Sequence, residues 1–206
     1  MIDAIAAADP RESALLDGLH VRLERSAAAA QSLDIAYRTI DSPIGGLLLA
    51  RTPVGLVRVA FAVQDLDAVL DELARLVSPR ILRSAGSLDA EARGFEAYFA
   101  GSARLDLPLD WRLSSGFRRQ VRRHLAGIPY GRTESYAQVA AAVGRPAAVR
   151  ATGSACATNP LPIVVPCHRV VRSDGSLGGY LAGLNAKRTL LQLESLNPRE
   201  WARHHE

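Results

Sequence analysis

Over residues 35–40, apolar and polar positions alternate with the period of two that is typical of β-strands, and two largely apolar runs follow at 47–50 and 56–63. The pattern predicts strands at 35–40, 47–50 and 56–63, separated by turns rich in Ser, Pro, Gly and Asp. A later alternating stretch at 105–111 predicts another strand that closes the sheet.

Two stretches of this first half follow a helical period instead. Apolar residues recur every three or four positions within 65–77, and a second helix is predicted over 88–100, ended by Gly101. We expect residues 35–112 to form a small N-terminal α/β sheet domain that acts as a scaffold, since no catalytic set is visible in it.

The second half has the pattern of short helices. Ser114 or Ser115 can cap a helix that runs to about residue 126, and Ser135 with Gln138 forms the S-x-x-Q pattern of a capping box. The helix that starts there ends near residue 143 and, after a break at 144–146, a second helix follows over 147–156.

Helix, glycine-containing break and second helix form the pattern of a helix-turn-helix. A last helix is predicted over 184–196, and the apolar run 163–165 predicts a strand. The chain is therefore expected to be an α+β protein, in which residues 113–206 form a helical C-terminal domain that contains the helix-turn-helix.

Residues 1–34 form an Ala-rich extension in which Leu15, Leu19 and Leu23 have helical spacing. We favour a plain tail over a docking segment, because the pattern is that of a marginal helix.

Composition narrows the class of protein. The chain has 206 residues, 48% of them hydrophobic, and a formal charge of +4 with far more arginine than lysine. Its two cysteines are too few for a disulfide framework, and no Cys/His cluster has zinc-site spacing. Without a signal-peptide pattern or a membrane-length apolar run, we expect a cytoplasmic protein with no membrane partner and no metal.

The predicted helix after Ser115 has a strongly basic face, formed by Arg118, Arg119, Arg122 and Arg123. Such a face is more often solvated than bound to a ligand, so phosphate binding by this helix is the lesser of two readings.

The candidate chemistry is concentrated in Pro166-Cys167-His168-Arg169. A thiol beside an imidazole and a guanidinium is typical of a nucleophile, because such neighbours control its pKa. The alternative is a buried cysteine followed by surface basic residues. The predicted second helix of the helix-turn-helix is built almost entirely of small residues, with Arg150 as its one large basic side chain. Small residues suit close approach to another backbone, either a packed protein neighbour or the wall of a DNA groove.

Taken together, these motifs resemble the O6-alkylguanine-DNA alkyltransferases, also called methylated-DNA–protein-cysteine methyltransferases. The similarity covers about residues 35–197 and rests on several ordered motifs: Asn159-Pro160, Pro166-Cys167-His168-Arg169-Val170, Ser42-Pro43-Ile44-Gly45, Ile128-Pro129-Tyr130-Gly131 and Gly179-Tyr180. The resemblance implies direct-reversal DNA repair, in which Cys167 irreversibly accepts an alkyl group from guanine O6, or from thymine O4, and is consumed.

The resemblance also implies roles for further residues. Adjacent side chains on an extended backbone face opposite ways, so His168 is expected to act on Cys167 through a water and to be held by Glu194. Tyr180 is expected to donate a proton to the departing base, and Asn159 to brace the active-site turn. The residues expected to contact DNA are Arg150, which fills the vacated stack, Tyr136, which crowds the adjoining phosphate, and Arg169, Ala151 and Ser154.

The implied partner is double-stranded DNA containing O6-alkylguanine, bound by a monomer through the minor groove with a flipped base, low sequence specificity and no cofactor. A non-catalytic sensor of alkylated DNA is the alternative, and the presence of Cys167 argues against it. A cysteine hydrolase is disfavoured because adjacent residues make a poor nucleophile–base pair. Cys156 and Leu181-Ala182 depart from the family pattern, and the zinc ligands of some members have no counterpart here.

Overall fold

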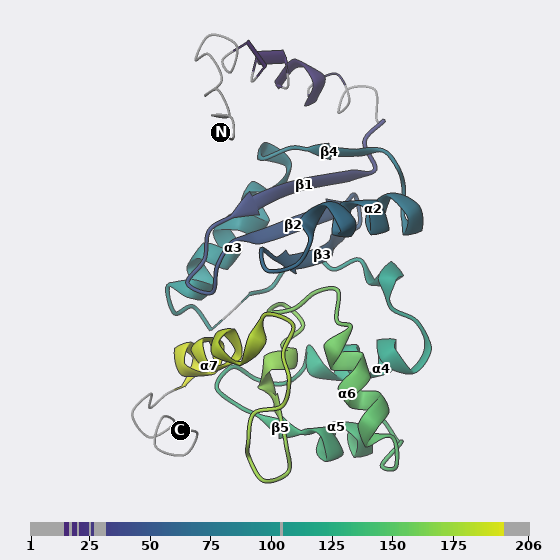
Figure 1. The fold of residues 1–206 in the computed structure, drawn as a ribbon, viewed down its shortest axis with the longest axis vertical. Coiled ribbons are helices and arrows are strands. Elements are labelled where there is room, and N and C mark those ends of the chain that lie inside the picture. Colours follow the sequence, from purple (N-terminus) through teal and green to yellow (C-terminus); the bar gives the residue numbers. More distant parts are fainter. Residues whose placement is uncertain are drawn as a thin grey trace, which may run out of the picture.

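The computed structural model describes residues 15–16, 18–19, 21–24, 26, 32–103 and 105–195. A sheet with its helices forms one half of the molecule, and a cluster of helices forms the other (Figure 1). The described residues among 15–26 are helical, and Leu15, Leu19 and Leu23 are exposed there. The rest of the predicted extension up to residue 31 lies outside the described residues.

The N-terminal half is built on a four-stranded sheet in the order β3-β2-β1-β4. Strands β1 (Ile35–Ile40), β2 (Leu47–Thr52) and β3 (Gly55–Phe61) are antiparallel neighbours and confirm the three predicted strands. The short strand β4 (Ile81–Arg83) pairs parallel to β1 and was not predicted, because three residues are too few for an alternating pattern to be recognised.

Helices cover both faces of this sheet. Helix α2 (Leu66–Leu76) begins at Asp65, whose carboxylate accepts a hydrogen bond from the Ala68 amide, and its Val69 and Leu73 pack on one face. Helix α3 (Asp89–Phe99), preceded by a 3₁₀ turn at Gly86–Leu88, packs on the other face, where the core continues into the helical half. Both helix predictions are confirmed.

The predicted strand at 105–111 is wrong. Only one bridge forms there, between Leu56 and Leu109, and a 3₁₀ turn follows at Trp111–Leu113. At this bridge the Leu56 amide donates to the Pro108 carbonyl and the Asp110 amide donates to the Leu56 carbonyl, each at 2.8 Å. The ladder does not continue, because Pro108 lacks the backbone N–H that the next hydrogen bond needs.

The C-terminal half contains α4 (Gly116–Leu125), α5 (Tyr136–Ala142), α6 (Val149–Ala157) and α7 (Gly183–Glu194). The capping box at α5 is confirmed, with Ser135 and Gln138 each bonding the other's backbone amide. Helices α5 and α6 form the helix-turn-helix pair. A short parallel pair, β5 (Glu134–Ser135) and β6 (Val170–Val171), ties its start to the segment after Cys167, which sequence alone did not predict. None of the described helices is long and apolar enough to span a bilayer.

Candidate active site

Cys167 lies in a tight turn and not at the end of a strand as predicted. Residues 161–165 form turns, and Cys167–Arg169 forms a 3₁₀ turn. Ile163 has a φ of 74°, a left-handed conformation that a β-branched residue rarely adopts and that interrupts any extended run. The expectation that Cys167 and His168 face opposite ways on an extended backbone therefore rested on the wrong local structure.

Asn159 organises this turn from its buried position. Its amide nitrogen donates to the Val165 carbonyl at 2.8 Å and to the Cys167 sulfur at 3.2 Å. Its amide oxygen accepts from the Leu161 backbone at 3.1 Å. One side chain thus fixes the path of the turn and also contacts the sulfur of the candidate nucleophile.

The Cys167 thiol is almost completely buried, with 2% of the residue exposed. Burial raises its pKa, while the hydrogen bond from Asn159 and the positive charges of Lys187 and Arg122 oppose that rise. The thiol therefore keeps its proton at neutral pH, so a nucleophilic role needs a base that removes the proton during the reaction.

His168 is fully buried and bonded to Glu194. Its Nε2 lies 3.0 Å from the Glu194 Oε1, while its Nδ1 is buried without a hydrogen-bond partner among the described residues. Burial lowers the pKa of His168, so the ring is neutral at neutral pH, although Glu194 opposes the shift. Because the carboxylate accepts a hydrogen bond from Nε2–H, Nδ1 is the free basic nitrogen.

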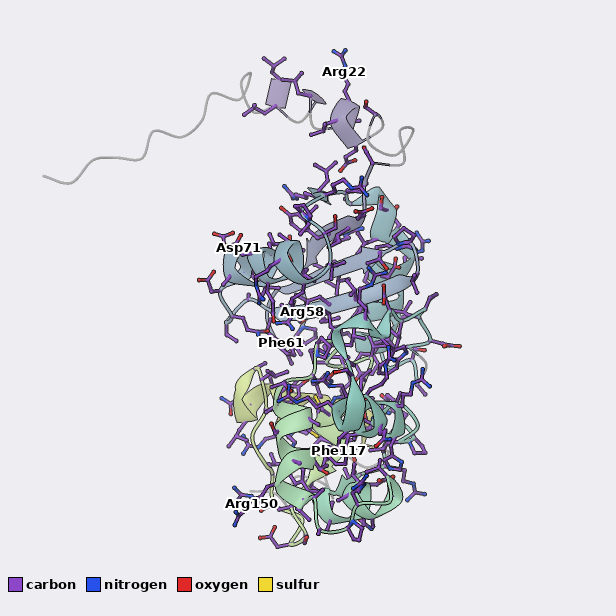
Figure 2. All side chains as sticks on the ribbon, turned by 90° about the vertical axis from the view of Figure 1, so that its right-hand side faces the viewer. Arg22, Arg58, Phe61, Asp71, Phe117 and Arg150 are labelled. Carbon is purple, nitrogen blue, oxygen red and sulfur yellow. The ribbon has the colours of Figure 1, made fainter. Side chains whose placement is uncertain are left out.

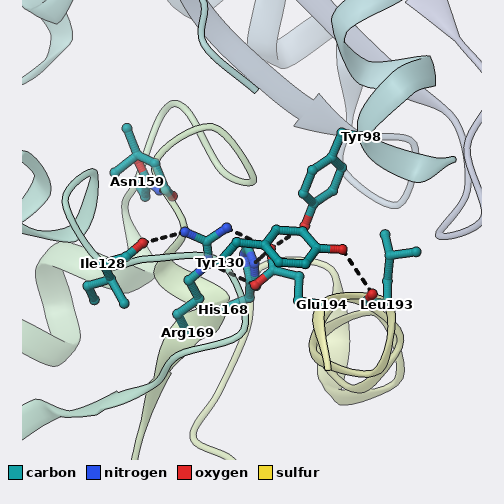
Figure 3. A network of polar contacts seen from close by, with 9 residues as sticks. Tyr98, Ile128, Tyr130, Asn159, His168, Arg169, Leu193 and Glu194 are labelled. Atoms are coloured by element: carbon teal, nitrogen blue, oxygen red, sulfur yellow. Dashed lines mark hydrogen bonds and ion pairs between the residues drawn. The ribbon is translucent and has the colours of Figure 1, made fainter. Parts of the chain in front are cut away.

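Glu194 is the centre of the buried polar network in Figure 3. Its carboxylate accepts from the Tyr98 hydroxyl at 2.6 Å and from two Arg169 nitrogens at 2.8 Å each, besides His168. Burial alone would raise the pKa of Glu194, but the hydrogen bonds from His168 and Arg169 outweigh it and lower the pKa to about 2. Glu194 is thus a permanent carboxylate that orients the imidazole.

Arg169 lies in this network and not on the expected DNA-contacting surface. Its side chain is 10% exposed, pairs with Glu194 and donates to the Ile128 carbonyl. All the contacts that hold its guanidinium are inside the protein, so the structure offers a positioning role in place of the predicted DNA contact.

Lys187 and Tyr98 complete the surroundings of the site, and the sequence analysis missed both. Lys187 has no exposed surface, and its ammonium donates to the Val170 and Gly178 carbonyls, which joins α7 to the segment beyond Cys167. Burial lowers the pKa of Lys187, which the Cys167 and Cys156 thiols partly counteract as they ionise. The sequence contained a signal that Lys187 is buried. Lys187 and Glu194 lie seven residues apart, on the same apolar face of α7 as Leu190 and Leu191.

A cavity of about 480 Å³ opens beside Cys167. Its other lining residues come from α5, α6 and the segment before α7: Tyr136, Gly153, Cys156, Ala157, Gly179, Tyr180 and Leu181. The Tyr180 hydroxyl is buried without a hydrogen-bond partner among the described residues, and burial raises its pKa well above the ordinary value. The volume of the cavity is in the range of small-ligand sites. The Tyr180 hydroxyl, which is protonated at neutral pH, lines it together with the Cys167 thiol.

The expected DNA-contacting residues lie on the helix-turn-helix side of this cavity. Arg150, Ala151 and Ser154 are exposed along α6, and Figure 2 shows Arg150 at the end of the molecule farthest from the sheet. Tyr136 is partly buried, and burial raises its pKa to about 12. Gly178 lies so close to it that a Cβ would sit 2.5 Å from the Tyr136 hydroxyl.

In the described part of the chain, no group of three or more His, Cys, Asp or Glu side chains is arranged to hold a metal ion. Both cysteines are free thiols.

Comparison with known proteins agrees with this geometry. Residues 116–196 match the family described as "6-O-methylguanine DNA methyltransferase, DNA binding domain". A methylated-DNA–protein-cysteine methyltransferase of Mycolicibacterium paratuberculosis is 46% identical over 162 residues, which is 78% of this chain and 92% of the relative.

Solved structures give the same result. The O6-methylguanine methyltransferase of Mycobacterium tuberculosis matches with a TM-score of 0.69 at 39% identity, over 78% of this chain and 92% of that one. The OGT protein of the same organism in complex with DNA matches with a TM-score of 0.68 at 41% identity, over 77% and 92%. The chain therefore belongs to the methylated-DNA–protein-cysteine methyltransferase family.

Proposed function

We propose that this protein repairs alkylated DNA by moving an alkyl group from guanine O6 to its own Cys167. The observation that carries the proposal is the Cys167 thiol, which lines a cavity of about 480 Å³ and has the His168–Glu194 pair behind it. The family to which the chain belongs and the DNA complex of its structural relative support the same reaction.

In the proposed reaction, the thiol proton leaves for the neutral His168, and the sulfur attacks the alkyl carbon. The S–C bond forms as the C–O6 bond breaks, and the products are a thioether and guanine. We assign proton removal to His168 Nδ1 through a water, since no hydrogen bond joins the Cys167 sulfur to the ring among the described residues. Glu194 holds the ring and stabilises the imidazolium that forms.

The departing guanine needs a proton, and we assign its donation to Tyr180. Tyr180 regains a proton through solvent from the His168 imidazolium, whose ring centroid lies 6.3 Å from that of the tyrosine. Its raised pKa keeps the hydroxyl protonated at neutral pH, and it lines the same cavity as the thiol. Asn159 positions the Cys167 sulfur through its hydrogen bond.

The substrate base is stacked in duplex DNA and must leave the stack to reach a buried thiol, at a cost of a few kcal/mol. We assign the filling of that gap to Arg150, on the exposed start of α6, and contact with the neighbouring phosphate to Tyr136. The small exposed residues Ala151 and Ser154 allow α6 to approach the minor groove closely.

We further propose that residues 35–112 serve as a scaffold domain and 113–206 as the DNA-binding and active-site domain. The Tyr98–Glu194 hydrogen bond would then couple the two. We also propose that the protein acts as a monomer in the cytoplasm, without a cofactor, where free thiols stay reduced.

The test is the stoichiometry of repair. Limiting protein is mixed with excess duplex that carries one O6-methylguanine, and repaired guanine is counted over time. We expect a plateau at one guanine per protein, retained in Cys156→Ala and absent in Cys167→Ala. Continued turnover, or loss of repair in Cys156→Ala alone, would overturn the proposal. Binding without repair by the wild-type chain would instead identify a sensor of alkylated DNA.

A further inference from the structure

A second polar cavity, of about 420 Å³, lies where the sheet half meets the helical half. Four arginines line it: Arg58 from β3, Arg112 from the linking turn, and Arg118 and Arg122 from α4. Glu72 of α2 is the one carboxylate among the lining residues, and Arg112 is paired with Asp110 at 2.7 Å, so the unneutralised charge comes from the other arginines. The mechanism proposed above uses none of these side chains.

Arg122 is a buried cation without a carboxylate partner in the described part of the chain. The residue is 2% exposed, and its guanidinium donates only to neutral acceptors: the carbonyls of Leu113, Ala155 and Thr158 and the hydroxyls of Ser114 and Thr158. Burial lowers its pKa to about 10. At neutral pH the guanidinium is charged. This side of the cavity therefore carries a positive charge that no carboxylate in the described residues neutralises.

Arg58 has hydrogen-bonding capacity left over at the same place. Its Nε is buried without an acceptor among the described residues, and its ion pair with Glu72, at 3.6 Å, is longer than a hydrogen bond. A buried unpaired donor on a charged group is costly, which favours an acceptor that arrives from outside the chain.

The start of α4 adds a third kind of donor. Ser115 stands at the N-cap but its side chain makes no capping bond, so the first-turn amides of this ten-residue helix have no side-chain acceptor in the described part of the chain. Arg118, in that first turn, is exposed and makes no hydrogen bond or ion pair within the described residues. Uncapped amides at a helix start attract anions, and arginine forks match the oxygens of phosphate.

We infer that this cavity, hereafter the arginine cleft (Arg58, Arg112, Arg118, Arg122 and Ser115), binds a phosphate group. It is separate from the contact assigned to Arg150, because Thr158, which lines it, ends α6, whereas Arg150 lies in the first turn of that helix. Figure 2 shows Arg58 near the border between the halves and Arg150 at the far end of the molecule. The phosphate can come from solution or from a nucleic-acid backbone.

The test uses the full chain and two probes. Inorganic phosphate is titrated calorimetrically at constant ionic strength, and a lesion-free duplex is titrated across a series of salt concentrations. The variants are Arg118→Gln and Arg58→Gln. The matched control is Arg119→Gln, which removes the same charge from the next residue of α4, outside the cleft lining.

We expect Arg118→Gln and Arg58→Gln each to weaken the binding of one probe roughly tenfold, because a charge-assisted hydrogen bond contributes about that factor. Arg119→Gln should change the affinity for that probe less than about twofold. A loss confined to inorganic phosphate identifies a free phosphate ligand. A loss confined to the duplex, with a salt slope reduced by about one, identifies a backbone phosphate. Absence of phosphate binding together with equal duplex affinities in all three variants would overturn the inference.

Discussion

The two halves of the molecule differ in how many charged and titratable side chains they bury. The sheet half buries Thr52, Ser84, Glu91 and Asp110 beside a mostly aliphatic core, whereas the helical half buries Arg122, His168, Arg169, Lys187 and Glu194. Charged groups are costly to remove from water even when they are paired, and an apolar replacement is often at least as stable. We therefore interpret the buried network of His168, Arg169, Lys187 and Glu194 as selected for the reaction of Cys167, and the sheet half as the part that supplies stability.

Glu194→Gln should have the largest effect of the variants that test this difference between the halves. The amide cannot hold His168 as a charge-stabilised base, and it leaves Arg169 buried without its carboxylate. We expect methyl transfer to slow by about 10²-fold or more, and the free energy of unfolding to fall by about 3–5 kcal/mol. Single-turnover kinetics and urea unfolding measure the two effects. Glu96→Gln, at an exposed position of α3, is the control, and equal effects in both variants would refute the role of Glu194.

Arg150→Ala tests whether the exposed face of the helical half acts only on DNA. Arg150 is exposed on α6 and contributes nothing to the buried network. We expect repair of O6-methylguanine in duplex to slow by roughly 10–100-fold, because the unstacking cost of a few kcal/mol is no longer offset. Reaction with the free base O6-methylguanine, measured in parallel, should not change, and stability should stay within about 0.5 kcal/mol. Equal slowing on the free base would show that Arg150 acts in the chemistry instead.

Low pH should reduce the free energy of unfolding through two groups of the helical half, Glu194 and His168. Glu194, with a pKa of about 2 in the folded state against the ordinary 4.5, contributes stability that is complete above about pH 4.5 and is lost as pH falls toward 2. The lowered pKa of His168 acts in the same direction below its ordinary value of 6.5. We expect the Glu194 contribution to be on the order of 3 kcal/mol. Urea unfolding between pH 7 and pH 3 should give a flatter profile for Glu194→Gln than for the wild type, and parallel profiles would contradict this account.

Lys187→Met sharpens the comparison by changing one buried charge near the thiol. The ammonium favours ionisation of Cys167, so its removal should raise the pKa of the thiol. We expect alkylation of Cys167 by iodoacetamide at pH 8 to slow by less than about tenfold, since a smaller fraction is thiolate. Arg188→Met, at the neighbouring half-buried position, is the matched control. The alkylation rate is also measured as a function of pH. The same pH dependence in Lys187→Met and in the wild type would assign Lys187 a purely structural role.

Sequence reasoning succeeded where the signal is local. Strand β1, helix α2 and the capping box at Ser135 follow from alternation, helical period and capping chemistry within a few residues. It failed where the partner is remote, as in the β5–β6 pair and the turn that Asn159 imposes on the apolar run at 163–165. Apolar content alone could not distinguish that buried turn from a strand.

The site shows the same division. The tetrapeptide at Cys167 identified the thiol and its imidazole neighbour, but Glu194 entered only through the family resemblance. Its place on the apolar stripe of α7, seven residues after Lys187, was a sequence signal of buried charge that was not used. Burial of Arg169 and the hydroxyl of Tyr98 could not be predicted, because both depend on contacts between segments far apart in the chain.

The most direct test of the central claim is to locate the transferred methyl group. Trypsin cuts after Arg150 and Arg169, so both cysteines fall in one peptide, residues 151–169, and fragment ions must distinguish them. After the full chain is mixed with duplex containing O6-methylguanine, the account predicts one added methyl on Cys167 and none on Cys156. An unmodified Cys167, or a methyl group on Cys156, would contradict it.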